Sequence, residues 1–170
     1  MKAITAEVVE TLVNLMRNIL GNRAVDIILG RLGEGATGRE LIYAFADETQ
    51  NLLGEKGGFS SMRQLGRELA RSIMSSNPRD KWEELLENTL NEFGFARKIE
   101  KEKDRAFICQ CVFYEILEGK NLKPTEHSVC WAGWGFIEGF VKEMEGAIGI
   151  QWVERDYENE KCRFDFIFQA

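Results

Sequence analysis

The chain has 170 residues, 44% of them hydrophobic, with 22 basic and 28 acidic side chains and a formal net charge of −6. This size and apolar content suit one compact domain, residues 1–170, and the acidic balance argues against a nucleic-acid-binding face. No stretch approaches the roughly 20 apolar residues of a membrane-spanning helix and no apolar leader follows Met1, so we expect a cytoplasmic protein with reduced cysteines.

The first part of the chain, residues 1–92, has a mainly helical pattern. Its apolar residues recur every three or four positions in five stripes. The stripes are separated by breaks at Gly21-Asn22, 33–38, Gly54 with Gly57-Gly58, and Asn77-Pro78. Ser60 or Ser61 is the predicted N-cap of the fourth helix.

Three arginines recur at every fourth position along that fourth helix. They are Arg63, Arg67 and Arg71, and Glu68 lies among them. The spacing fits a solvated stripe, and the sharper alternative is that the stripe binds an anionic ligand group or a partner.

In the second part, residues 93–170, alternation replaces the helical period. Phe95 with 98–99 and then 106–112 predict one hairpin, and 148–152 with 163–168 predict a second. Between the hairpins, a helix rich in glycine and aromatic residues is predicted from Pro124-Thr125 to about Glu145. We therefore expect an α+β fold: N-terminal helices followed by a four-stranded antiparallel sheet, with this helix between the two hairpins.

Aromatic residues concentrate on the helix between the hairpins. This set, with the residues that can face it, consists of Trp131, Trp134, Phe136, Phe140, Tyr43, Phe45, Phe113 and Tyr114. Such a lining suits an apolar ligand, and the alternative is an ordinary aromatic core. The glycines Gly133, Gly135 and Gly139 each cost about 1 kcal/mol in a helix, so they predict either a close backbone contact or room for a guest.

The remaining reactive side chains carry weaker signals. His127, the single histidine, is a candidate proton donor or ligand, or else a surface or capping residue. Cys109 and Cys111 are oxidant sensors or packed thiols. The sequence contains no nucleotide-binding loop and none of the common metal-protease or hydrolase motifs, so the interpretation leans away from an enzyme and no catalytic residue is assigned.

Several short segments taken together resemble a known family. They are Gly21-Asn22-Arg23-Ala24 with 28–33, 111–115, Cys130 with Gly133, Gly135-Phe136 and Gly139, and Glu154 with Cys162-Arg163-Phe164. In this order they are similar to the 4-vinyl reductase domain family, whose members bind small molecules, including hydrocarbons, and are related in fold to the TRAPP trafficking subunits. The similarity covers nearly the whole chain.

The resemblance implies a sheet packed on helices, a homodimer formed through the N-terminal helices, and a buried pocket for a hydrophobic or aromatic molecule. In one branch of the family, zinc is bound by three cysteines and a glutamate. Cys130, Glu154 and Cys162 match three of those positions, and the fourth falls at or near Tyr157. Structural zinc needs four ligands, so zinc binding and packed thiols without a metal are both open.

Three functions follow as hypotheses. The first is a dimeric protein that binds or senses a small hydrophobic molecule and acts through a separate protein partner. The second is a TRAPP-like structural or assembly subunit. The third is an accessory protein or enzyme in the reduction of a tetrapyrrole vinyl group.

Overall fold

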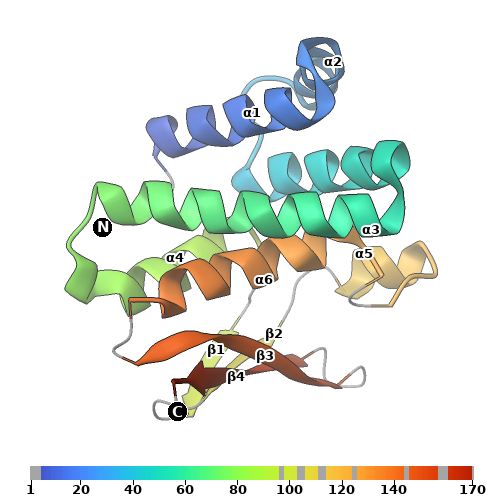
Figure 1. Ribbon diagram of the computed structural model, residues 1–170. Helices are drawn as coiled ribbons and strands as arrows, with labels where there is room; N and C mark the ends of the chain where they lie inside the picture. The colour runs from blue at the N-terminus through green and yellow to red at the C-terminus, as the bar shows by residue number, and fades with distance from the viewer. Residues whose placement is uncertain are drawn as a thin grey trace.

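The computed structural model describes residues 5–95, 98–102, 106–110, 114–123, 126–143, 146–156 and 161–169; the side chains of 98–102, 106–110, 114–115, 152–156 and 161 are outside this description. The helices are α1 (Ala6–Leu20), α2 (Asn22–Leu32), α3 (Gly38–Ser75), η1 (Arg79–Lys81, a 3-10 helix), α4 (Trp82–Glu92), α5 (Tyr114–Gly119) and α6 (Ser128–Val141). The strands are β1 (Lys98–Glu102), β2 (Ala106–Gln110), β3 (Ala147–Asp156) and β4 (Lys161–Phe168). In Figure 1, α1 and α2 form the top of the molecule, α3 lies beneath them, and α6 lies between α3 and the sheet.

The first two helices begin and end where the local sequence dictates. The Thr5 side chain accepts a hydrogen bond from the Val8 N–H and caps α1. Gly21 and Gly33 follow α1 and α2 with φ of 87° and 75°, values that side chains with a Cβ rarely adopt. The predicted breaks at these two positions are confirmed.

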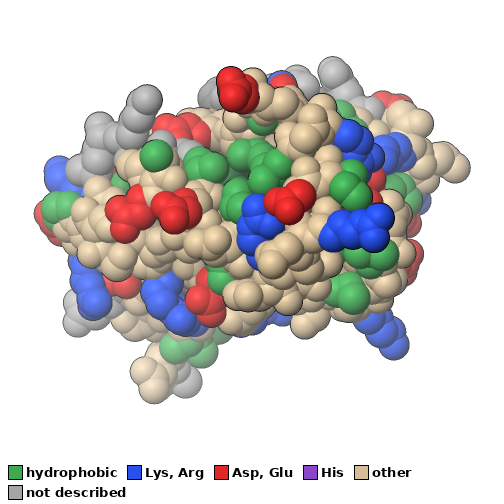
Figure 2. Space-filling view, turned by 90° about the horizontal axis from the view of Figure 1, so that it is seen from above, with side chains coloured by type: hydrophobic (Ala, Val, Ile, Leu, Met, Phe, Trp, Pro, Cys, Tyr) green, Lys and Arg blue, Asp and Glu red, His purple; other side chains and the backbone are tan. Residues whose placement is uncertain are grey.

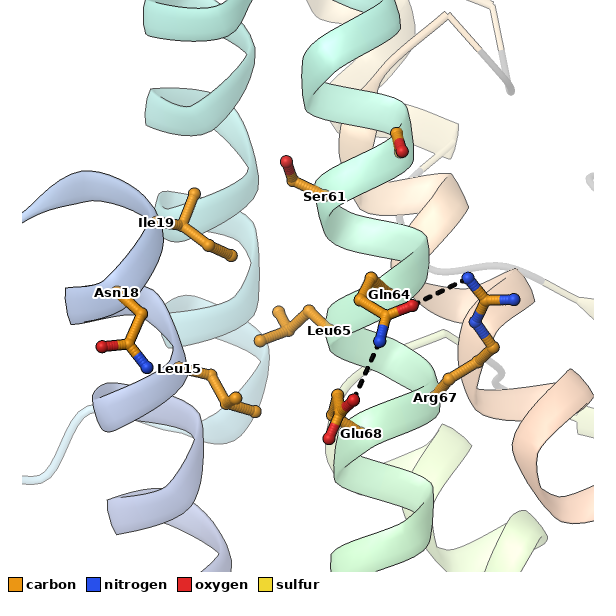
Figure 3. A pocket seen from close by; sticks show the side chains of 9 residues that line it. Leu15, Asn18, Ile19, Ser61, Gln64, Leu65, Arg67 and Glu68 are labelled. Carbon is orange, nitrogen blue, oxygen red and sulfur yellow. Dashed lines mark hydrogen bonds between the residues drawn. The ribbon is translucent and has the colours of Figure 1, made fainter.

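Helix α3 is folded into two arms at a single glycine. Thr37 and Glu40 form a capping box at its start, and Gly54 interrupts it with φ 76° and ψ 179°. We call residues 38–53 the first arm and 55–75 the second arm; the two lie side by side in Figures 1 and 3. The predicted cap at Ser60 or Ser61 is wrong, because the second arm begins directly after Gly54.

The strands form one antiparallel sheet of order β1-β2-β4-β3. On β4, Cys162, Phe164 and Phe166 are buried, whereas Arg163 and Asp165 between them are partly exposed and hydrogen-bonded to each other. This alternation is the period of two expected for a sheet with one covered face. Helix α6 contacts β3 and lies over the sheet in Figure 1.

The predicted fold class requires correction. We expected an α+β fold of N-terminal helices followed by a four-stranded antiparallel sheet, whereas six α-helices account for most of the described residues and the fold is mainly helical. Among the strands that the structure describes, β3 has 10 residues and β4 has 8, whereas β1 and β2 have 5 each. The long part of the sheet is therefore the β3–β4 pair. The physical reason is that α3 folds back on itself and α6 packs against it, so the helices bury much of their apolar surface on one another.

The region between the hairpins also differs from the prediction. A short helix, α5, follows β2, and α6 begins at Ser128; the predicted start at Pro124-Thr125 lies outside the described residues. Within the described ranges, none of the helices is both long enough and apolar enough to cross a membrane.

Candidate functional site

The second arm of α3 and helix α6 run parallel with their backbones in contact. A Cβ on Gly66 or Gly135 would overlap backbone atoms of the opposite helix, and one on Gly139 would lie 2.5 Å from the Cβ of Ala70. Only glycine permits this approach. Of the two roles predicted for the glycines of α6, the structure therefore shows close backbone contact at Gly135 and Gly139.

His127 caps the N-terminus of α6 and is 1% exposed. Its Nδ1 accepts a hydrogen bond from the Val129 N–H at 3.1 Å, so the ring proton is on Nε2, which donates to Asp47 Oδ1 at 3.0 Å. Burial lowers the pKa of His127 below its ordinary value, despite the nearby carboxylate. The predicted capping role is confirmed, and both ring nitrogens are occupied by protein groups.

Asp47 joins His127 to two further residues. Lys120 Nζ lies 3.1 Å from the same Oδ1 and 5.4 Å from the centre of the Tyr43 ring, which stacks on His127. Burial raises the pKa of Asp47, but the hydrogen bonds from His127 and Lys120 outweigh it, and the net pKa is lowered. Sequence reasoning missed this partner because Asp47 lies 80 residues from His127.

Gln50 completes the attachment of α6 to the first arm. Its side-chain oxygen accepts hydrogen bonds from the backbone N–H and the hydroxyl of Ser128, at 2.6 and 2.9 Å, and its amide donates to the Glu126 carbonyl. Asp47 and Gln50 are three residues apart, which places them on one face of the first arm. This cluster anchors the start of α6 to the first arm of α3.

The two tryptophans of α6 belong to a continuous stack on the same helix pair. Phe59 stacks on Trp131, Trp131 on Trp134 at 5.0 Å between ring centres, and the Arg63 guanidinium lies 4.8 Å from the centre of the Trp134 ring. Arg63 also forms a bidentate pair with Glu138, with both N–O distances 2.7 Å. Protein groups therefore already lie on the tryptophan faces that a planar guest would use.

The other residues of the predicted pocket lie in different places. Phe136 and Phe140 are fully buried, Phe136 packing on Phe93, and Phe45 is buried in the helical core. Phe113 and the side chain of Tyr114 lie outside the described residues. The described members are thus divided among the core, the tryptophan stack and the His127 anchor, and they do not form a single lining.

The predicted zinc ligands are only partly described. Cys130 is half-buried on α6 and Cys162 is buried on β4. In the β3–β4 ladder, Glu154 is opposite Arg163 and Cys162 is opposite Arg155, but the Glu154 side chain and Tyr157 lie outside the description. Among the described side chains, no three of the His, Cys, Asp and Glu residues gather as a metal site would require. Zinc binding stays a prediction.

A groove on the opposite side of the second arm, between it and α1, is the candidate site. It has a volume of about 410 Å³. Its lining consists of Leu15, Asn18, Ile19, Ser60, Ser61, Gln64, Leu65, Arg67 and Glu68. Figure 3 shows Leu15, Ile19 and Leu65 directed toward one another between the helices. Figure 2, a view from the α1 and α2 side, shows hydrophobic side chains in a hollow bordered by charged ones.

The polar rim of the groove has two kinds of group. The Gln64 amide is already engaged, because it donates to Glu68 and accepts from Arg67 at 2.8 and 2.9 Å. Ser60 and Ser61 on the second arm also line the groove, and Figure 3 shows Ser61 on the side of the second arm that faces α1. The groove therefore offers an apolar surface with hydroxyl groups at one edge.

Searches with family models, against curated proteins and against solved structures found no match to this chain. The similarity to the 4-vinyl reductase domains thus stays a prediction from the short segments quoted above.

Proposed function

We propose that the protein binds a small hydrophobic molecule, as the resemblance to the 4-vinyl reductase domains implies, and that it binds this molecule in the groove between α1 and α3. The observation that carries the proposal is the groove itself. Its volume of about 410 Å³ lies within the range of small-molecule sites, and its floor is formed by leucine and isoleucine side chains.

The chemistry of the lining indicates the ligand class. Leu15, Ile19 and Leu65 offer no hydrogen bond, so the body of the ligand has to be apolar. Ser60 and Ser61 can each donate or accept, which suits a phenol hydroxyl or a carboxyl group. We place the ligand here rather than beside Trp131 and Trp134, because those rings are covered by neighbouring protein groups.

The test is ligand-dependent thermal unfolding with 2-naphthol and with decanoate. A ligand at 100 times its Kd stabilises the folded state by about 2.7 kcal/mol, which raises the Tm by several degrees. Ser61→Phe places a ring in the groove and should abolish this rise. Ser72→Phe is the matched control, since Ser72 is on the same arm, is half-buried and does not line the groove. An equal rise in the Ser61→Phe protein would contradict the proposal.

A second candidate function is assembly with protein chains, including a homodimer through the N-terminal helices. It is favoured by three exposed apolar side chains: Ile27 on α2 is 52% exposed, and Leu52 and Leu53 at the end of the first arm are 57% and 47% exposed. Exposed apolar residues of this size are typical of contact surfaces when they gather into a patch.

The oligomeric state of two variants tests this candidate. Ile27→Asp and Leu52→Asp should convert a dimer into a monomer in light scattering, and Ile148→Asp, at a side chain 58% exposed on β3, is the control. A wild-type protein that is monomeric at all concentrations would rule out the homodimer and leave the small-molecule proposal unaffected.

A further inference from the structure

A second hollow lies where the second arm of α3 and helix α6 both end, and its lining is more strongly charged than that of the groove. Its volume is about 200 Å³, and residues from the end of α3, from η1 and from the end of α6 line it. The lining consists of Arg67, Arg71, Met74, Ser75, Arg79, Gly139, Lys142 and Glu143. Four of the eight are cationic and one is a carboxylate, in a chain whose net charge is −6.

These cations are poorly neutralised by the residues that the structure describes. Arg67 donates to the neutral Gln64, and its buried Nε has no hydrogen-bond partner in the described part of the chain. Arg71 forms an ion pair with Glu68 at 3.5 Å, with its own side chain largely exposed. Arg79 and Lys142 form no ion pair with any described residue. Figure 3 shows the Arg67 guanidinium on the α6 side of the second arm.

The two helices that border the hollow account for part of the positive charge. The second arm of α3 and helix α6 run parallel and both end here, and the carbonyl end of each helix carries about half a negative charge. These ends and Glu143 together offset about two of the four positive charges. Glu68 does not line the hollow, and its pairing with Arg71 offsets one more charge, so about one positive charge remains in the concave site.

We propose that this hollow, which we call the basic pocket, binds a phosphate group. Three guanidinium groups and one ammonium group around a small cavity match the charge and the several oxygens of a phosphate dianion. The volume leaves space beside the phosphate for the group that carries it, either a small phosphorylated molecule or a phospholipid headgroup. The basic pocket shares only Arg67 with the groove. The failure of one binding proposal would therefore not contradict the other.

The experiment measures binding of inorganic phosphate by calorimetry and Tm, with sodium chloride at matched ionic strength as the reference. Binding to phosphatidylcholine vesicles with and without phosphatidic acid is measured in parallel. R79Q/K142Q removes two exposed cations and should weaken phosphate or vesicle binding at least about tenfold. R23Q/K56Q is the control, since it makes the same charge change at exposed residues outside the basic pocket.

Each outcome decides the proposal. Phosphate binding that R79Q/K142Q loses and R23Q/K56Q keeps supports a site for phosphorylated small molecules. The same pattern only with vesicles that contain phosphatidic acid supports a headgroup site. Absence of binding in both assays, or equal binding by the two double variants, overturns the proposal; the cations then serve only to neutralise the two helix ends.

Discussion

The second arm of α3 has two neighbours, and it meets them in opposite ways. Toward α6 it presents Gly66 and Ala70, and the two backbones touch. Toward α1 it presents Leu65 with the polar residues around it, and a groove of about 410 Å³ remains. One helix thus forms both a closed contact and an open one, and the difference lies in side-chain size. The contact with α6 holds the two helices together, and the groove toward α1 leaves space for the proposed ligand.

The largest expected effect comes from adding one methyl group on the closed side. Gly135→Ala would drive a Cβ into the Arg63 carbonyl and separate the helices, which should lower the free energy of unfolding by about 3 kcal/mol or more. Urea unfolding followed by circular dichroism measures this change. A loss below about 1 kcal/mol would show that the two helices do not depend on backbone contact.

Removal of the guanidinium between the two helices should have the next largest effect. Arg63→Met leaves Glu138, which is 7% exposed, without its partner, and should cost about 2–3 kcal/mol after allowance for the partial exposure of Arg63. The double variant Arg63→Met/Glu138→Met should be more stable than Arg63→Met alone, because no buried charge is left unpaired. If the double variant is the less stable one, the pair is not the source of the effect.

A pH titration tests the His127 anchor. The pKa of His127 in the folded protein lies below the ordinary 6.5. Between these two pKa values the unfolded chain binds more protons than the folded one. The free energy of unfolding should therefore fall as the pH decreases from 6.5 through the folded pKa. Protonation of Nδ1 removes the helix cap, a loss of about 1 kcal/mol. Asp47 adds a loss only near and below pH 3.8.

Denaturant unfolding at pH 7 and pH 5 provides the measurement. The variant His127→Asn keeps a side chain that can cap α6 but lacks the titrating ring, so its stability should change less between these values than that of the wild type. Equal changes in the two proteins would place the titration elsewhere.

The smallest effect is expected on the solvent side of α2. Gly30 is exposed within that helix and a Cβ there would meet no atom within 4 Å. Gly30→Ala should raise the free energy of unfolding by about 0.5–1 kcal/mol, because alanine loses less backbone entropy. The change in the free energy of unfolding is expected to be positive for Gly30→Ala and negative for Gly135→Ala. Urea unfolding of both variants therefore separates the effect of the helix contact from the general effect of replacing glycine by alanine.

Several features could be predicted from the sequence because they depend on neighbouring residues. Gly21, Gly33 and Gly54 end or reverse helices through their own positive φ. The alternation over 163–168 predicts a strand from the period of two alone. The predicted fold class was wrong because the balance of helix and sheet depends on which surfaces the helices bury on one another.

The sequence by itself determined where the chain turns and which stripe of each helix is apolar, since these properties extend over a few residues. Only the tertiary structure decided that Asp47 accepts a hydrogen bond from His127, that Gly135 lies against Arg63, and that Arg67 and Lys142 line one hollow. Each of these pairs joins residues that are far apart in the chain. The amino-acid pattern near either member contains no signal of the other, because packing alone brings them together.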